Sequence, residues 1–67
     1  MKTGELYRVF FASKFVYFCA VSDLIDEHNP EESYAHVVWI TNSELAPYLV
    51  VYNTSLIGEK KEFICRF

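Results

Sequence analysis

The sequence predicts an all-β fold, either a five-stranded small barrel or a strongly curved antiparallel sheet, with one short helical insert. The chain has 67 residues, which is room for a single domain spanning 1–67. Hydrophobic residues make up 52% of it and aromatic residues 18%, enough to build a core and too many for disorder. Five short runs rich in aromatic and β-branched residues, each bounded by a polar turn, are typical of strands.

The first two strands are predicted at residues 6–11 and 15–21, joined by a tight hairpin at 12–14. Side chains alternate between the two faces of a strand. In the second run one face carries Phe15, Tyr17, Cys19 and Val21, and the other carries Val16, Phe18 and Ala20. Because both faces are apolar, we expect this strand to be central or to be covered on its outer side.

The helical insert is predicted at residues 22–28. Ser22 or Asp23 could cap its start, and acidic residues in a first turn suit the helix dipole. Leu24 and Ile25 would hold the turn against the core. The pair at positions 29–30, Asn-Pro, then ends it.

The remaining strands are predicted at residues 34–41, 48–52 and 62–67. In the first of these, Ala35, Val37 and Trp39 share one face, and His36, Val38 and Ile40 share the other. A turn is expected at 42–47 and a loop, which contains Gly58, at 53–61, with Leu56 and Ile57 anchoring that loop in the core. Closure into a barrel would remove the exposed edges of such apolar strands.

The opening residues 4–9, Gly-Glu-Leu-Tyr-Arg-Val, resemble the start of many SH3-like barrels. The similarity covers six of 67 residues and carries no functional residue with it. What it implies is limited to the fold, which we expect to be an SH3-like or related small barrel.

Charge and segment lengths exclude several functional classes. The net charge is −3 and the isoelectric point about 5.2, which disfavour general nucleic-acid binding and adhesion to anionic membranes. No apolar run is long enough to cross a bilayer, and no signal peptide is recognisable, so a cytoplasmic location is expected. With only two glycines, the chain has no glycine-rich phosphate cradle.

No catalytic motif is present, so we expect a non-enzymatic protein without a cofactor. Cys19 and His36 are the residue types of a nucleophile and a base, but Cys19 lies in an apolar run where a thiol is inert. Cys19 and Cys65 are expected to be buried free thiols, with a disulfide between them as the alternative. The acidic segment lacks the spacing and the glycine of a calcium loop, so no metal site is predicted.

The predicted function is a small protein-interaction module, an inhibitor or adaptor that binds or occludes a partner protein. An acidic segment without lysine or arginine would steer a partner electrostatically, and exposed aromatic rings would anchor it. The candidate residues are Asp26, Glu27, Glu31, Glu32, Trp39, Tyr48 and Tyr52. A homodimer that buries the surplus apolar surface is a variant of this hypothesis.

The alternative function is a nucleic-acid-binding small barrel. Such barrels stack bases on exposed rings beside a basic groove. The basic residues available for a groove are Arg8, Lys14 and Arg66, which would have to share one face after the first and last strands pair. The acidic balance of the chain weighs against this alternative.

Overall fold

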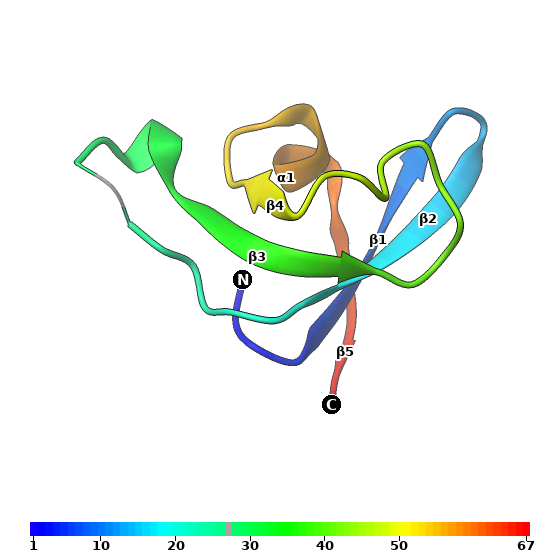
Figure 1. The fold of residues 1–67 in the computed structure, drawn as a ribbon, viewed down its shortest axis with the longest axis horizontal. Helices are drawn as coiled ribbons and strands as arrows, with labels where there is room; N and C mark the ends of the chain where they lie inside the picture. The colour runs from blue at the N-terminus through cyan, green and yellow to red at the C-terminus, as the bar shows by residue number, and fades with distance from the viewer. Residues whose placement is uncertain (27) are drawn as a thin grey trace.

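The protein folds as a single five-stranded antiparallel sheet with the order β4-β3-β2-β1-β5 (Figure 1). The computed structural model describes residues 1–26 and 28–67. The strands are β1 (Glu5–Phe11), β2 (Lys14–Ala20), β3 (Tyr34–Trp39), β4 (Val50–Tyr52) and β5 (Glu62–Arg66). They are joined by a 3-10 turn, η1 (Pro30–Glu32), and a short helix, α1 (Leu56–Lys60). The predicted mostly β architecture with five strands is confirmed, and its one short α-helix lies at a different position from the predicted insert.

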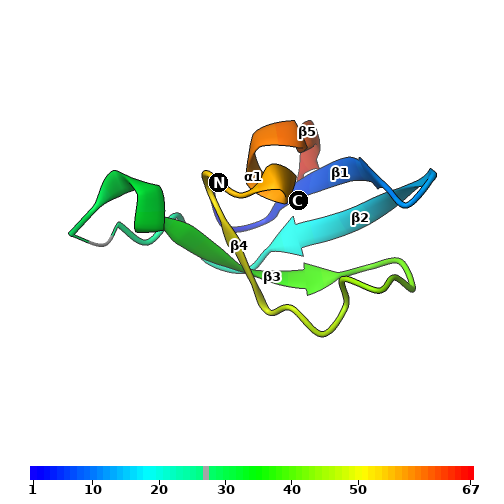
Figure 2. The same ribbon diagram turned by 90° about the horizontal axis from the view of Figure 1, so that it is seen from above.

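The sheet is open, so the structure shows a curved sheet and no closed barrel. β1 pairs with both β2 and β5, as the predicted meeting of the first and last strands requires. In the part of the chain that is described, β4 and β5 remain the two edges of the sheet. α1 contacts both β4 and β1 and so covers part of the opening that a further strand pairing would have closed (Figure 2).

The predicted helical insert at 22–28 is wrong, and its Glu27 lies outside the described residues. Ile25 instead forms an antiparallel bridge with Tyr34, in which Ile25 N donates to Tyr34 O at 2.6 Å. The Leu24 amide donates to the Met1 carbonyl at 2.9 Å. The amides of Leu24 and Ile25 are those that a capping side chain at the helix start would have satisfied, so long-range pairing takes the place of the predicted cap.

Asp23, one of the two expected helix caps, fastens the N-terminus instead. Its Oδ1 accepts hydrogen bonds from the Thr3 amide at 2.8 Å and the Thr3 hydroxyl at 3.0 Å. The two hydrogen bonds stabilise the carboxylate and lower the pKa of Asp23 below its ordinary value. Asp23 is therefore a structural acid and is separate from the other acids of the segment.

α1 occupies a stretch that the sequence predicts as a loop. Ser55 caps it, because its hydroxyl accepts the Gly58 amide at 3.0 Å. Gly58 lies against the end of β4, and a Cβ atom there would be 2.1 Å from the Tyr52 carbonyl oxygen. The absence of a side chain at Gly58 is what allows the helix to pack this closely on the strand.

The core lies on one side of the sheet, which we call the inner face. It is a cluster of buried side chains from β1, β2, β3 and β4: Tyr7, Val9, Val16, Phe18, Val37 and Val51. The Tyr7 and Phe18 rings stack at 5.5 Å, and Trp39 packs on Phe18 at 5.0 Å. The opposite side of the strands, the outer face, has no layer of the described chain packed across it, and its apolar side chains are largely exposed.

The β1–β2 hairpin turns through two residues, Ala12 and Ser13, between the paired Phe11 and Lys14. Both have positive φ angles, 52° and 65°. This is the backbone of the two-residue hairpin turns that favour Asn-Gly, because left-handed φ values are costly for other residues. The pairing of β1 with β2 therefore holds this turn in a conformation that its own residues disfavour.

Candidate protein-binding groove

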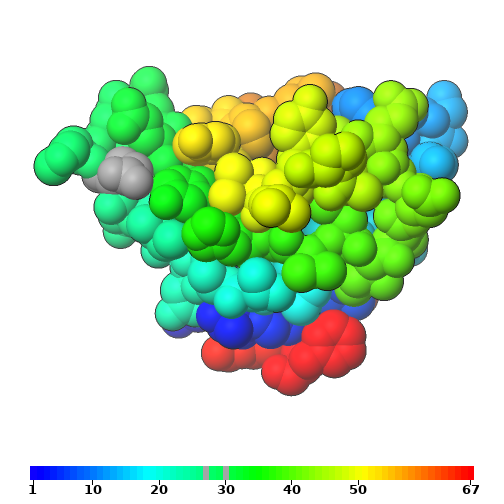
Figure 3. Space-filling model, viewed as in Figure 1, coloured from blue at the N-terminus to red at the C-terminus, as the bar shows by residue number. Residues whose placement is uncertain are grey.

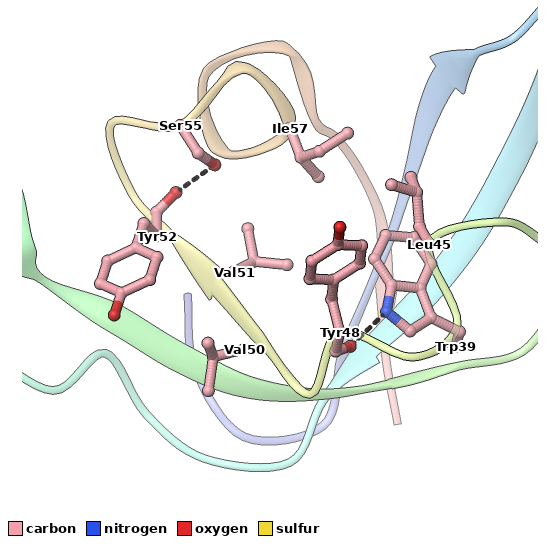
Figure 4. Close-up of a pocket in the computed structure, with 8 residues that line it drawn as sticks. All are labelled: Trp39, Leu45, Tyr48, Val50, Val51, Tyr52, Ser55 and Ile57. Atoms are coloured by element: carbon pink, nitrogen blue, oxygen red, sulfur yellow. Dashed lines mark hydrogen bonds between the residues drawn. The ribbon is translucent and has the colours of Figure 1, made fainter.

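An apolar groove of about 360 Å³ opens on the inner side of the molecule, between α1 and the β3–β4 connection (Figure 4). It is lined by Trp39, Leu45, Tyr48, Val50, Val51, Tyr52, Ser55 and Ile57. The lining is almost entirely hydrocarbon and aromatic. A groove of this composition accepts an apolar group and offers few polar atoms to hold a charged one.

The connection between β3 and β4 forms one wall of the groove and is held by its own hydrogen bonds. Trp39 Nε1 donates to the Tyr48 carbonyl at 2.7 Å (Figure 4). The Tyr48 amide donates in turn to the Leu45 carbonyl at 2.9 Å. The indole therefore contributes its apolar surface to the groove while its one donor is already used.

The opposite wall comes from α1 and the turn before it. Ser55 Oγ donates to the Tyr52 carbonyl at 2.7 Å, and Ile57 packs against the core below it (Figure 4). The Tyr52 ring is directed away from Ile57 and Leu45 and lies 5.6 Å from the Tyr34 ring. Tyr52 thus borders the groove mainly with its backbone, whereas Tyr48, 62% exposed, presents its ring there.

The three predicted aromatic anchors therefore meet at one groove, but they do not contribute equal side-chain surface to it. Trp39, Tyr48 and Tyr52 all line the same groove, although they come from the end of β3, the connection and β4. Trp39 and Tyr48 offer side-chain surface, and Tyr52 is turned aside. Ile57 packs against the core as the sequence predicts, but its place in the groove wall was not anticipated. Leu45 was missed, because its only signal is that it is a single aliphatic residue inside an expected turn.

The predicted acidic residues form a separate structure, which we call the acidic hook: Asp26, Glu31 and Glu32, at or beside η1. Ser33 Oγ donates to Asp26 Oδ1 at 2.9 Å and so holds Asp26 close to the start of β3. Glu31 and Glu32 are exposed within η1. Glu27, the fourth predicted acid, lies outside the described residues. The hook extends from one end of the molecule, with β4 between it and the β3–β4 connection (Figure 3).

Backbone contacts fasten the hook to the rim of the groove. Thr54 Oγ1 donates to the Glu31 carbonyl at 2.9 Å, and the Asn53 amide donates to the Ser33 carbonyl at 2.8 Å. Residues 53 and 54 directly follow β4 and precede Ser55 of the groove wall. The acids and the groove therefore lie on neighbouring parts of the surface, although their side chains do not meet.

Charge is segregated along the chain. All six lysine and arginine residues lie within residues 1–14 or 60–67, whereas residues 15–59 contain seven of the nine acids. Every residue that lines the groove lies between positions 39 and 57, and the only charged residue in that stretch is Glu44. The groove is therefore lined by uncharged side chains, while α1, one of its walls, ends at Lys60.

The cations expected to form a basic groove do not share a face. Arg8 lies on the outer face, where its Nε contacts Glu62 Oε2 at 2.8 Å and its guanidinium stacks 4.4 Å from the centre of the Phe15 ring. The hydrogen bond to Glu62 raises the pKa of Arg8. Arg66 is opposite Glu5 in the β1–β5 register, on the other face, and Lys14 is at the hairpin.

The two cysteines are free thiols on the outer face, but Cys19 is only half-buried and Cys65 is exposed, so the predicted burial of both is wrong. Leu6 of β1 is paired with Cys19 on one side and with Cys65 on the other. Two strand spacings of about 4.8 Å separate them, which exceeds the roughly 7 Å limit between Cα atoms for a disulfide. The disulfide alternative is therefore excluded in this fold.

Within the described part of the chain, no group of three or more His, Cys, Asp or Glu side chains could hold a metal ion. None of the helices there is long and apolar enough to cross a membrane. No protein-family model, curated protein or solved structure matches the chain. The function is therefore argued from the geometry alone.

Proposed function

We propose that this protein is a non-enzymatic interaction module, an inhibitor or adaptor, that binds a partner protein through the apolar groove. The observation that supports this most directly is the groove itself, about 360 Å³ in volume and walled by Trp39, Tyr48 and Ile57. Pockets that hold ligand groups measure about 300–1,000 Å³ and are lined in this way. Buried aromatic and aliphatic contacts of this kind dominate the affinity of protein interfaces.

The partner we propose is an extended segment with one large apolar side chain flanked by basic residues. The apolar side chain would fill the groove, and its lysine or arginine neighbours would lie toward Glu31 and Glu32 of the acidic hook. Complementary charge at a rim acts mainly on association rate and specificity, while the desolvated anchor supplies affinity. The groove and the acidic hook can therefore be tested separately, the groove through the affinity and the hook through the association rate.

Two further points belong to the proposal. β5 lies beside β1 and a short helix precedes β5, which favours an open relative of SH3-like barrels, where aromatic-lined grooves bind extended peptides. The two free thiols fit a reducing, cytoplasmic location. Single-stranded nucleic acid is the competing ligand, and the placement of Arg8 and Arg66 on opposite faces does not favour it.

The test is selection of peptides from a displayed random library, followed by affinity measurements against two matched variants. Tyr48→Ala removes the ring that enters the groove, and Tyr52→Ala removes a ring of the same type that is turned away from it. We expect Tyr48→Ala to weaken binding by about 10-fold or more, as loss of a central aromatic contact does, and Tyr52→Ala to weaken it less than about 3-fold. Equal affinities for the wild type and Tyr48→Ala would refute the groove.

A second arm tests the charge. Glu31→Gln combined with Glu32→Gln should lower the association rate of lysine-containing peptides several-fold at low ionic strength, with little change in dissociation. The effect should disappear in high salt. A change confined to the dissociation rate would show that the acids contact the peptide directly and do not merely steer it.

A further inference from the structure

We infer that the outer face of the sheet packs against the outer face of a second copy of this chain. The residues that carry this inference are Leu6, Phe10, Phe15, Cys19, Val38 and Ile40. They come from β1, β2 and the end of β3 and lie on the side of the sheet opposite to the groove.

The strand register places these side chains in continuous rows. One row crosses four strands, from Cys65 through Leu6 and Cys19 to Val38. A second contact joins Phe10 and Phe15, whose rings meet edge to face at 5.3 Å. Residues directly opposite in neighbouring antiparallel strands share a face, so both rows belong to the outer face. Between them lies a polar row, in which Arg8 is paired with Glu62 on one side and Tyr17 on the other.

The outer face exposes a large apolar area for so small a domain. Phe10 is 61% and Phe15 41% exposed, which together leaves roughly 200 Å² of phenylalanine in water. Val38, Ile40 and Val21 on the same face are each half exposed or more, which brings the exposed apolar area to the order of 500 Å². Two such faces would bury on the order of 1,000 Å² together, which is the size of a weak specific interface.

The face carries little net charge. Its two opposite charges, Arg8 and Glu62, form an ion pair with each other, and the Arg8 guanidinium lies over the Phe15 ring. The acidic hook lies next to the start of β3, at the opposite end of that strand from Val38. A copy of the chain, although it carries a charge of −3, therefore meets no cluster of like charges here.

A second copy fits this surface better than a transient partner. Homodimer and obligate interfaces are more apolar than transient ones and resemble a domain core cut in half. An apolar sheet face must be buried against another layer, and the inner face already has its layer. Face-to-face packing of two sheets at about 10 Å would complete it and would leave both grooves accessible on the outside of the dimer.

The experiment is the solution mass of the full chain by sedimentation or light scattering, up to about 1 mM, the upper limit of weak specific association. The wild type should approach twice the chain mass of 7.9 kDa. Val38→Lys places a charge in the outer face and should remain at the monomer mass. The matched control, Tyr48→Lys, places the same charge in the groove and should still dimerise.

Circular dichroism shows whether both variants fold, and thiol labelling supplies an independent measurement. Cys19 and Cys65 lie on the outer face, so a dimer formed there should slow their reaction with a maleimide several-fold at dimer-forming concentrations. A wild type that stays monomeric overturns the proposal. So does a dimer that survives Val38→Lys, or one whose thiols label as fast as in the monomer, since that dimer would use another surface.

Discussion

The two faces of the sheet are made of the same kinds of residue, but they differ in how far their side chains are buried. Val37 and Val38 are neighbours in β3, yet Val37 is 2% exposed and Val38 54% exposed. Phe18 is fully buried on the inner face, whereas Phe10 lies largely in water on the outer one. Hydrophobicity thus decides which residues can form a core, and the availability of a covering layer decides which of them do.

The covering layer of the inner face comes from segments with weak sequence signals. α1 and the β3–β4 connection contribute Ile57 and Leu45 to the core, and β4 contributes Val51. The outer face has no corresponding segment in the described residues. The following predictions test how far this asymmetry determines stability.

The largest effect is expected from Phe18→Ala compared with Phe10→Ala. Phe18 is enclosed by Tyr7 and Trp39, so its truncation leaves a cavity and should cost about 3–5 kcal/mol of unfolding free energy. That approaches the whole stability of a domain this small. Phe10→Ala should cost less than about 1 kcal/mol at concentrations below association. Urea denaturation measures both, and similar losses for the two variants would mean that the outer face is already buried in the monomer.

Gly58→Ala should destabilise the layer over the inner face. On helix propensity alone the substitution would stabilise α1 by about 1 kcal/mol. The new Cβ would instead meet the Tyr52 carbonyl oxygen at 2.1 Å, so we expect a loss of about 1–3 kcal/mol as the helix shifts from β4. Thermal unfolding gives the sign, and a higher melting temperature would contradict the close packing of α1 on β4.

The β1–β2 turn belongs to neither face and provides a neutral reference. Replacing Ala12 by Asn and Ser13 by Gly fits the positive φ angles at both positions and should stabilise the protein by about 1–2 kcal/mol. The oligomeric state and the peptide affinity should not change. Destabilisation in urea would show that the turn does not adopt this backbone in solution.

The smallest expected effect on stability concerns Tyr7, on the inner face, and it appears only at alkaline pH. Burial, together with the hydrogen bond that its hydroxyl donates to Glu5 at 2.9 Å, raises the pKa of Tyr7 from 10.0 to about 12. The raised pKa means that the folded state keeps the proton longer than the unfolded chain does. Stability from this source is complete below pH 10 and is lost as the pH rises toward 12. Tyr7→Phe should reduce this loss of unfolding free energy as the pH rises from 10 toward 12. If the loss is unchanged, it arises from other titrating groups.

Much of the candidate site could be anticipated and some of it could not. Trp39 and Tyr48 stand out in the sequence as large rings near turns, and the structure brings them to one groove. Leu45 could not be assigned, because a single aliphatic residue in a turn carries no period, and the period of residues 56–57 is too short to show that Ile57 lines a groove. The expected cap at Asp23 failed because its carboxylate is used by Thr3, twenty residues away, and no local pattern reports such a partner.

Alternation and aromatic content are enough to locate the strands, because they act over a few residues and do not depend on distant contacts. Composition also shows that more apolar surface exists than one small core can hide. Local patterns do not show which face is covered, that β4 and β5 fail to pair with each other, or that residues 22–26 are extended and not helical. Those outcomes depend on competition between long-range partners for the same backbone groups and the same apolar surface, and that competition is settled in three dimensions.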